Sequence, residues 1–96
     1  MNSQNISDEI KSLTYTFVRV LIETTGGELT VPVKFVDIYN DACRTRFGNN
    51  NKCEGNSELR QHVRDNLLGS GYIFVDPSDV DLIYLTQKAI DECSEY

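Results

Sequence analysis

The feature that most constrains this chain is the stretch GYIFVDPSDVDLIYLTQKAI at residues 71–90. It consists of an apolar run, a polar break, a second apolar run and a helix start. Both runs are rich in β-branched and aromatic residues, which favour strands. The break DPSD suits a tight turn, because Asp favours the first turn position and Pro the second. We therefore predict a hairpin over 71–85 that leads directly into a helix near 87–95, with Thr86 as its cap.

Two helices are expected upstream, near residues 8–24 and 33–47, because apolar residues recur there at helical spacing. A flexible arm at residues 1–7 should precede the first helix, and its last residue, Ser7, can act as the cap. The glycine pair at 26–27 should end that helix. The segment ELTV is predicted to be a short extended piece, and Gly48 should end the second helix.

A third helix is predicted over residues 57–68, with Ser57 as its cap and Gly69 closing it. Its expected buried stripe is Leu59, Val63 and Leu67. The predicted order is helix, short strand, helix, helix, strand, strand, helix. A chain of 96 residues has room for one modest core, so we expect a single α+β domain over residues 8–96.

Composition narrows the class of protein. The net charge of −6 argues against a domain that coats nucleic acid indiscriminately, since such affinity comes from cationic groups that displace counterions. No apolar stretch approaches the ~20 residues of a membrane helix. The polar, acidic start MNSQNISDEIK resembles neither a secretion signal nor a transit peptide, so we expect a cytoplasmic protein without a membrane partner. The glycosylation sequon at Asn5 is then best explained as a chance match.

The charge is unevenly spread along the chain. Residues 41–68 contain five Lys and Arg against four Asp and Glu, whereas residues 69–96 contain Lys88 alone against six carboxylates. If the chain binds DNA, the sequence therefore favours its middle part as the contact region.

The order of elements is that of a winged helix-turn-helix, and two segments carry a closer resemblance. NLLGSGYIFVD and DLIYLTQKAI resemble the winged-helix transcription regulators of the MarR and PadR type. In that family a recognition helix is followed by a wing hairpin and by a last helix that opens with an LT.KG-like motif; here Ala89 stands where the family usually has Gly. The resemblance covers residues 8–90 as architecture and residues 67–89 as motif. It implies a DNA-binding regulator, and the small acidic format suits an archaeal, viral or plasmid source.

By position in that family, the third helix would enter the major groove. The residues expected to contact bases are Ser57, Arg60, Gln61 and Arg64. Arg can pair bidentately with guanine, and Gln with adenine. The residues expected to contact phosphates are Arg44, Arg46, Lys52 and Asn56. Phosphate contacts position a protein without reading sequence. The alternative interpretation of these arginines is the solvated face of an amphipathic helix.

Two features depart from the family pattern. The loop between the second and third helices has about nine residues, where tight helix-turn-helix units use about three or four. The wing carries Asp76, Asp79 and Asp81 and no cation, so it should stay off the phosphates. A rival function is therefore a winged-helix module that binds a basic protein partner through the acidic wing and the last helix.

A homodimer is also expected, as in regulators of this type. The first helix contains the strongly apolar segment FVRVLI, which is more than one small core need cover. The residues predicted for the interface are Phe17, Val18, Leu21, Ile90 and Cys93. The alternative is that the first helix is central and wholly covered by its own domain.

The three cysteines are expected to be free thiols in a reducing cytoplasm. A bridge between Cys43 and Cys53 stays open as the alternative, as does a zinc site made of Cys43, Cys53, His62 and Cys93. Their spacing lacks the paired C-x-x-C element of structural zinc sites, so no metal is predicted.

The acidic wing lacks the Gly and the distal Glu of an EF-hand calcium-binding loop. No catalytic motif is present, so we expect no enzyme activity, no cofactor and no small-molecule effector.

Overall fold

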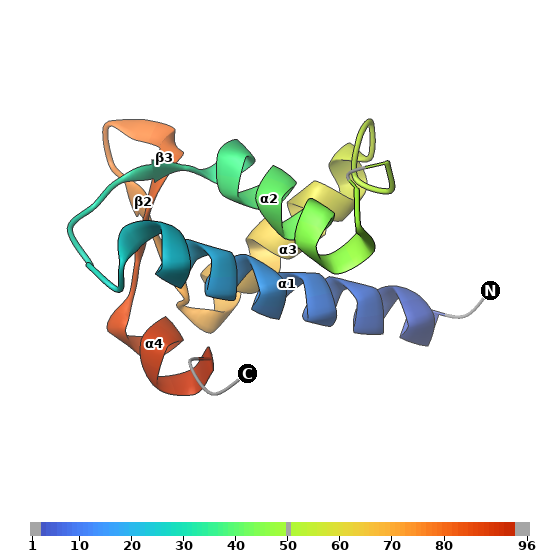
Figure 1. Ribbon diagram of the computed structural model, residues 1–96, viewed down its shortest axis with the longest axis horizontal. Coiled ribbons are helices and arrows are strands. Elements are labelled where there is room, and N and C mark those ends of the chain that lie inside the picture. The colour runs from blue at the N-terminus through green and yellow to red at the C-terminus, as the bar shows by residue number, and fades with distance from the viewer. Residues whose placement is uncertain (1–2, 50, 94–96) are drawn as a thin grey trace.

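The chain forms an α+β fold with the predicted order of elements in the computed structural model, which describes residues 3–49 and 51–93 (Figure 1). The elements are α1 (Ser3–Thr25), β1 (Val33–Lys34), α2 (Phe35–Phe47), α3 (Ser57–Ser70), β2 (Ile73–Asp76), β3 (Asp79–Leu85) and α4 (Gln87–Cys93).

The three strands form one antiparallel sheet in the order β1-β3-β2. The predicted hairpin is confirmed: Phe74 of β2 lies opposite Tyr84 of β3. The short strand β1 adds to the other edge of β3, where Val33 pairs with Ile83. Because α2 begins at the residue after β1, the sheet fixes the point at which α2 starts.

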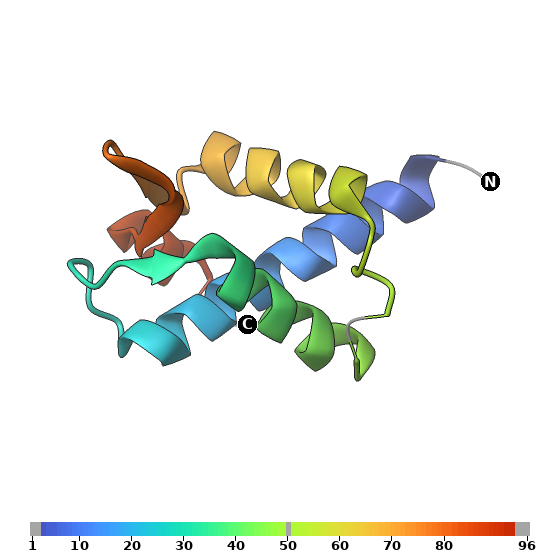
Figure 2. The same cartoon turned by 90° about the horizontal axis from the view of Figure 1, so that it is seen from above.

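The long helix α1 runs through the molecule and packs against both α2 and α3 (Figures 1 and 2). The hairpin and α4 lie at one end of the long axis, and the loop between α2 and α3 lies towards the other. The overall dimensions are 40 × 28 × 24 Å. The acidic hairpin with α4 and the loop after α2 are therefore far apart.

A single core joins the helices to the inner face of the sheet. Its largest fully buried side chains include Leu13, Phe17 and Leu21 of α1, Ile38 and Tyr39 of α2, Leu67 of α3, and Ile83 and Leu85 of β3. The predicted stripe of α3 is confirmed, since Leu59, Val63 and Leu67 are all buried. The rings of Phe17, Phe35 and Tyr39 follow one another through this core with centroids 5.0 and 6.0 Å apart.

Several element boundaries differ from the prediction. α1 begins at Ser3, so residues 3–7 are helical and not part of an arm, whereas residues 1 and 2 lie outside the described part. The short strand is at 33–34 and not in ELTV, because residues 33–34 are the ones that reach β3. α3 continues through Gly69 to Ser70, and Gly71 takes the left-handed conformation, with φ 75°, that ends it. α4 is described up to Cys93, and residues 94–95 of its predicted span lie beyond the described part.

Thr86 connects the hairpin to α4 in the way that the sequence suggests. Its hydroxyl oxygen accepts a hydrogen bond from the backbone N–H of Ala89 at 3.2 Å, which confirms the predicted cap. The same hydroxyl donates to the carbonyl of Gly71 at 2.7 Å. Thr86 therefore joins the start of α4 to the end of α3, across the base of the hairpin.

Candidate functional site

The start of α3 is capped by Asn56 and not by Ser57. The Asn56 side-chain oxygen accepts from the backbone N–H of Leu59 at 3.0 Å, and Asn56 has non-helical backbone angles. Ser57 is already in the first helical turn, so the predicted cap is one residue late. Asn56 was expected to contact phosphate, but its side-chain oxygen is already hydrogen-bonded to the first turn of α3.

The solvent face of α3 carries the residues predicted to contact bases. Ser57, Arg60 and Gln61 are exposed. The amide nitrogen of Gln61 donates to the carboxylate of Asp65 one turn further on, at 2.8 Å. The side chain of Arg60 has no hydrogen bond or ion pair with another residue in the described part of the chain. Arg60 is therefore the residue on this face whose guanidinium is most available to a ligand.

Arg64 has a different place from the one expected. Its guanidinium donates to the backbone carbonyl of Val80 in the hairpin at 2.7 Å, and it lies 4.9 Å from the centre of the Phe35 ring. Arg64 is half-buried by these contacts. It ties α3 to the hairpin and to the first residue of α2, so its expected role as a free base-reading side chain does not match its contacts.

A groove of about 500 Å³ lies between α3, the start of α2 and the hairpin. It is lined by Phe35, Val36, Arg60, Gln61, Arg64, Val80 and Asp81. Val36 and Val80 are exposed there, at 42% and 67%. Sequence reasoning missed these two valines, since Val36 adjoins the apolar stripe of α2 and Val80 looks like an ordinary strand residue. The groove thus combines cationic and amide donors with apolar surface.

Tyr39 lies in the core and stacks on Phe35, which lines this groove. Its side chain is 2% exposed, and its hydroxyl has no hydrogen-bond partner among the residues described. Burial raises the pKa of Tyr39, and the nearby positive charge of Arg60 partly opposes that rise. The charge of Arg60 thus lies close enough to the hydroxyl to act on its protonation.

The predicted phosphate-contacting cations gather at the far end of α2. Arg44 is paired with Asp41 one turn earlier in the helix. The guanidinium of Arg46 lies 5.3 Å, and the ammonium of Lys52 lies 5.0 Å, from the centre of the Phe47 ring. Arg46 also donates to the hydroxyl of Ser12 in α1 at 2.6 Å. Phe47 therefore holds two exposed cations together, a role that its sequence position alone does not reveal.

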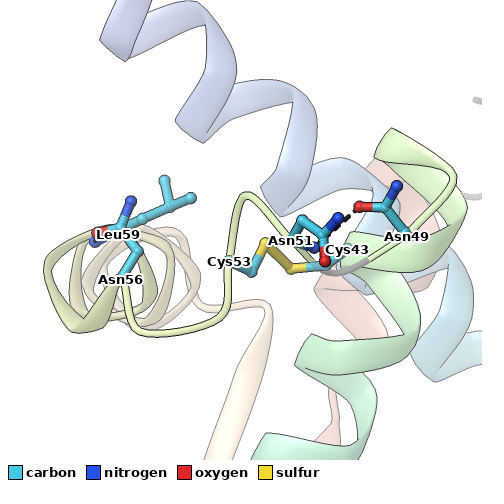
Figure 3. The surroundings of a disulfide bond; sticks show 6 residues. All are labelled: Cys43, Asn49, Asn51, Cys53, Asn56 and Leu59. Atoms are coloured by element: carbon cyan, nitrogen blue, oxygen red, sulfur yellow. Dashed lines mark hydrogen bonds between the residues drawn. A yellow bond between two sulfur atoms is a disulfide. The ribbon is translucent and has the colours of Figure 1, made fainter.

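Cys43 and Cys53 form a disulfide with their Cα atoms 6.4 Å apart (Figure 3). The expectation of free thiols is therefore wrong for Cys43 and Cys53, which form the alternative disulfide. Cys93 is a free, buried thiol, as expected. The zinc alternative loses two of its four ligands to this bond. Within residues 3–49 and 51–93, no group of three or more His, Cys, Asp or Glu side chains is placed to hold a metal ion.

Four of the five residues expected at a dimer interface belong to the core. Phe17, Val18, Leu21 and Cys93 are 0% exposed within the single chain. They have no surface left for a second copy, because the elements packed around α1 cover the first three and Cys93 is enclosed in the core at the end of α4. Ile90 is partly buried against the same core and retains some exposure.

The hairpin presents carboxylates that are organised by local hydrogen bonds. Asp76 accepts from the backbone N–H of Ser78 at 2.7 Å and from the Tyr84 hydroxyl at 2.9 Å. These bonds lower the pKa of Asp76, and the same partnership raises the pKa of Tyr84. Asp79 accepts from the N–H of Asp81 at 2.9 Å. The tip of the hairpin is therefore a fixed anionic surface.

The outer face of the hairpin is also apolar. Phe74 is 56% exposed and packs against Tyr84 with ring centroids 6.1 Å apart. A second groove, of about 470 Å³, runs beside this pair and is bounded by Leu29 and Pro77. The strand pattern would have revealed this feature, because Phe74 alternates with the buried Ile73.

Comparison with protein-family models, with curated proteins and with solved structures finds no match to this chain. No helix in the described residues is both long and apolar enough to cross a membrane.

Proposed function

We propose that this chain is a winged helix that binds double-stranded DNA, with the N-terminal half of α3 in the major groove. The observation that carries the proposal is Arg60, which is exposed beside Gln61 on the solvent face of α3 and whose side chain has no partner among the described residues. An α-helix fits the major groove, and Arg and Gln are the side chains that pair bidentately with guanine and adenine. Ser57 stands at the start of the same face.

The residues around this face fit the same role. Arg46 and Lys52, held together by Phe47, would contact phosphates, with Arg44 and Asn56 nearby. Exposed Val36 offers the apolar contact that a thymine methyl group accepts. Arg64 acts as a positioning residue here: it fixes the angle between α3 and the hairpin through Val80.

The hairpin corresponds to the wing in this proposal. Its carboxylates, Asp76, Asp79 and Asp81, would repel phosphate, so the wing stays off the DNA backbone. We further propose that the protein regulates transcription and acts as a homodimer, in a cytoplasm that leaves the Cys43–Cys53 bond oxidised, as that of hyperthermophiles does. The dimer must use surface other than the four buried residues, with Ile90 as the remaining member of the predicted set.

Fluorescence anisotropy with a labelled duplex, recorded across a salt series, tests the proposal. A duplex selected from a random pool serves as the specific probe. Arg60→Ala should weaken binding to that duplex by about 1–3 kcal/mol and relax its specificity, because it removes one base contact. Lys88→Ala is the matched control: it removes an equal charge from α4, where Lys88 faces Glu92.

The results distinguish DNA recognition by α3 from the alternative that its arginines are only the solvated face of an amphipathic helix. Affinity should fall steeply as salt rises, since phosphate contacts release counterions. Equal losses for Arg60→Ala and Lys88→Ala would mean that α3 contributes only general charge, and the major-groove assignment would then be wrong.

The second candidate function is a protein-interaction module, and the outer face of the hairpin favours it. Phe74 is 56% exposed there, and its neighbour Tyr84 donates to the carboxylate of Asp76. A basic, partly apolar partner segment would suit this surface. Absence of DNA binding at low salt by the folded protein would favour this alternative.

A further inference from the structure

The loop between α2 and α3 is long and polar, and a disulfide crosses it. Cys43 lies in the last turns of α2 and is completely buried, whereas Cys53 lies in the loop, three residues before the cap of α3, and is 5% exposed. The intervening sequence RTRFGNNNK contains Gly and Asn, which favour turns over regular structure. The covalent bond is thus the direct link between the core of α2 and the segment that leads into α3.

A short series of hydrogen bonds extends from the disulfide to the candidate base-reading residue. The carbonyl of Cys53 accepts from the backbone N–H of Asn56 at 3.0 Å. The side chain of Asn56 accepts from the N–H of Leu59 (Figure 3). The carbonyl of Asn56 accepts from the N–H of Arg60 at 3.3 Å. Two hydrogen-bonded steps therefore connect Cys53 to the backbone of Arg60.

The disulfide also fixes a phosphate-contacting candidate. Lys52 precedes Cys53 directly, and its ammonium lies over the Phe47 ring. Phe47 is one turn beyond Cys43 in α2. Lys52 is thus held between two points of the same helix, one covalent and one through the aromatic ring.

We propose that the Cys43–Cys53 disulfide positions the N-terminal end of α3 and Lys52 for DNA, so that tight binding requires the oxidised protein. This inference rests on the proposed function. The bond acts through Asn56 and Lys52 and does not itself touch the ligand. Its role goes beyond general stabilisation, because the groups that it orders are the ones assigned to bases and phosphates.

Reduction would release both groups together. A dithiol reductant such as dithiothreitol attacks one sulfur, the S–S bond breaks, and each cysteine sulfur gains one electron and one proton. The reductant is oxidised to its own cyclic disulfide. The loop then loses its covalent attachment to α2, while the core contacts of Leu59, Val63 and Leu67 still hold the body of α3 in place.

The test compares oxidised protein, dithiothreitol-reduced protein and the Cys43→Ala/Cys53→Ala variant, each shown to be folded by circular dichroism. Cys93→Ala is the matched control, since it removes the free, buried cysteine and leaves the disulfide intact. Amide hydrogen exchange reports on the start of α3, and anisotropy with the selected duplex across a salt series reports on binding.

Once the disulfide is lost, we expect exchange at the amides of Leu59 and Arg60 to accelerate about five- to tenfold more than exchange at Leu67, as for loss of a helix cap, because the core amide of Leu67 reports only the general loss of stability. Binding should weaken about tenfold, with a salt slope smaller by about one contact. Cys93→Ala should behave as the wild type. Equal exchange and equal affinity in folded protein without the disulfide would overturn the inference.

A second pair of variants keeps the disulfide and breaks the series at Asn56. Asn56→Ala should reproduce the faster exchange and the weaker binding, and Asn56→Ser, which preserves a capping oxygen, should restore both. If the oxidised protein binds no DNA, the proposed function fails. The exchange measurement then still decides whether the disulfide orders the start of α3: unchanged exchange removes the positioning role as well.

Discussion

Tyr39 is the most unusual single residue in the core. Its ring packs between the core side chains of α2 and stacks on Phe35, yet its hydroxyl makes no hydrogen bond within the described residues. A buried donor without a partner loses its hydrogen bonds to water and gains none in return. The hydroxyl therefore destabilises the fold at this position, while the ring stabilises it.

Tyr39→Phe should raise the free energy of unfolding by about 1 kcal/mol, because the ring stays and the unpaired hydroxyl is removed. Urea denaturation followed by circular dichroism measures this change. Tyr72→Phe is the contrasting variant: Tyr72 is also buried, but its hydroxyl donates to Glu92 at 3.0 Å, so the loss of that hydroxyl should lower stability. A lower stability of Tyr39→Phe would contradict the assignment of an unsatisfied hydroxyl.

The same tyrosines predict a pH dependence on the alkaline side. Burial raises the pKa of both Tyr39 and Tyr72 above the ordinary value of 10.0, and the bond to Glu92 adds to the shift of Tyr72. A folded-state pKa above the unfolded one gives stability that is complete below pH 10.0 and is lost as the pH rises through the folded value. Urea midpoints between pH 8 and 12 should therefore fall above about pH 10, and less so in Tyr39→Phe.

Asp76 predicts an effect at the acid side of the pH range. The hydrogen bonds from Ser78 and Tyr84 hold its pKa below the usual 3.8. A lowered folded-state pKa gives stability that is present above 3.8 and is lost as the pH falls through the folded value. Tyr84→Phe should move the pKa of Asp76 upwards in a side-chain carbonyl NMR titration. Phe74→Leu, which alters the neighbouring ring and keeps the hydroxyl, should leave it in place.

At the scale of elements, Thr86 is the side chain that joins the hairpin to α4. Thr86→Ala removes both its bond from Ala89 and its bond to Gly71, so we expect a loss of about 1–2 kcal/mol in the free energy of unfolding. Thr86→Ser keeps the hydroxyl and should retain most of the stability. Thermal unfolding of the three proteins distinguishes them, and equal values for Ala and Ser would show that the hydroxyl is unimportant.

The helices and the hairpin could be predicted because their signals are local. Leu59, Val63 and Leu67 recur at helical spacing, and DPSD stands between two strand-forming runs. The boundaries were less accessible where two adjacent residues could serve equally well. Asn56 and Ser57 are both good caps, and the difference lies in which one has a side chain that reaches Leu59.

The candidate site was harder to predict because its contacts are long-range. Arg64 looks like a free arginine on α3 until the fold brings the carbonyl of Val80, 16 residues away in the chain, against it. The burial of Phe17 and Val18 depends in the same way on how three elements meet around α1. Residue spacing along one helix predicts which face of the helix a residue occupies, but it does not predict which residues far away in the sequence will contact it.

For the molecule as a whole, the disulfide should contribute to stability as well as to position. It closes a loop with a sequence separation of 10. Loss of the bond should cost about 2–3 kcal/mol, since a loop of this size is then free in the unfolded chain. Guanidinium denaturation with and without dithiothreitol measures the difference, and Cys93→Ala under both conditions is the control. An unchanged midpoint would mean that the unfolded chain gains no freedom from reduction.

The acidic hairpin lies far from the loop after α2, so the charge of the molecule is unevenly distributed and the molecule has an electric dipole. Residues 69–96 hold one lysine against six carboxylates, which is five of the six net negative charges of the chain. The described part of this stretch, which forms the hairpin and α4, lies at the opposite end of the 40 Å long axis from the loop after α2, which contains Lys52. A polyanion would therefore exert a torque before any contact forms and would turn the cationic end of α2 towards itself. If the chain binds DNA as proposed, this charge distribution would give the approach a preferred orientation, and the field responsible would fade within about one Debye length, ~8 Å at physiological salt.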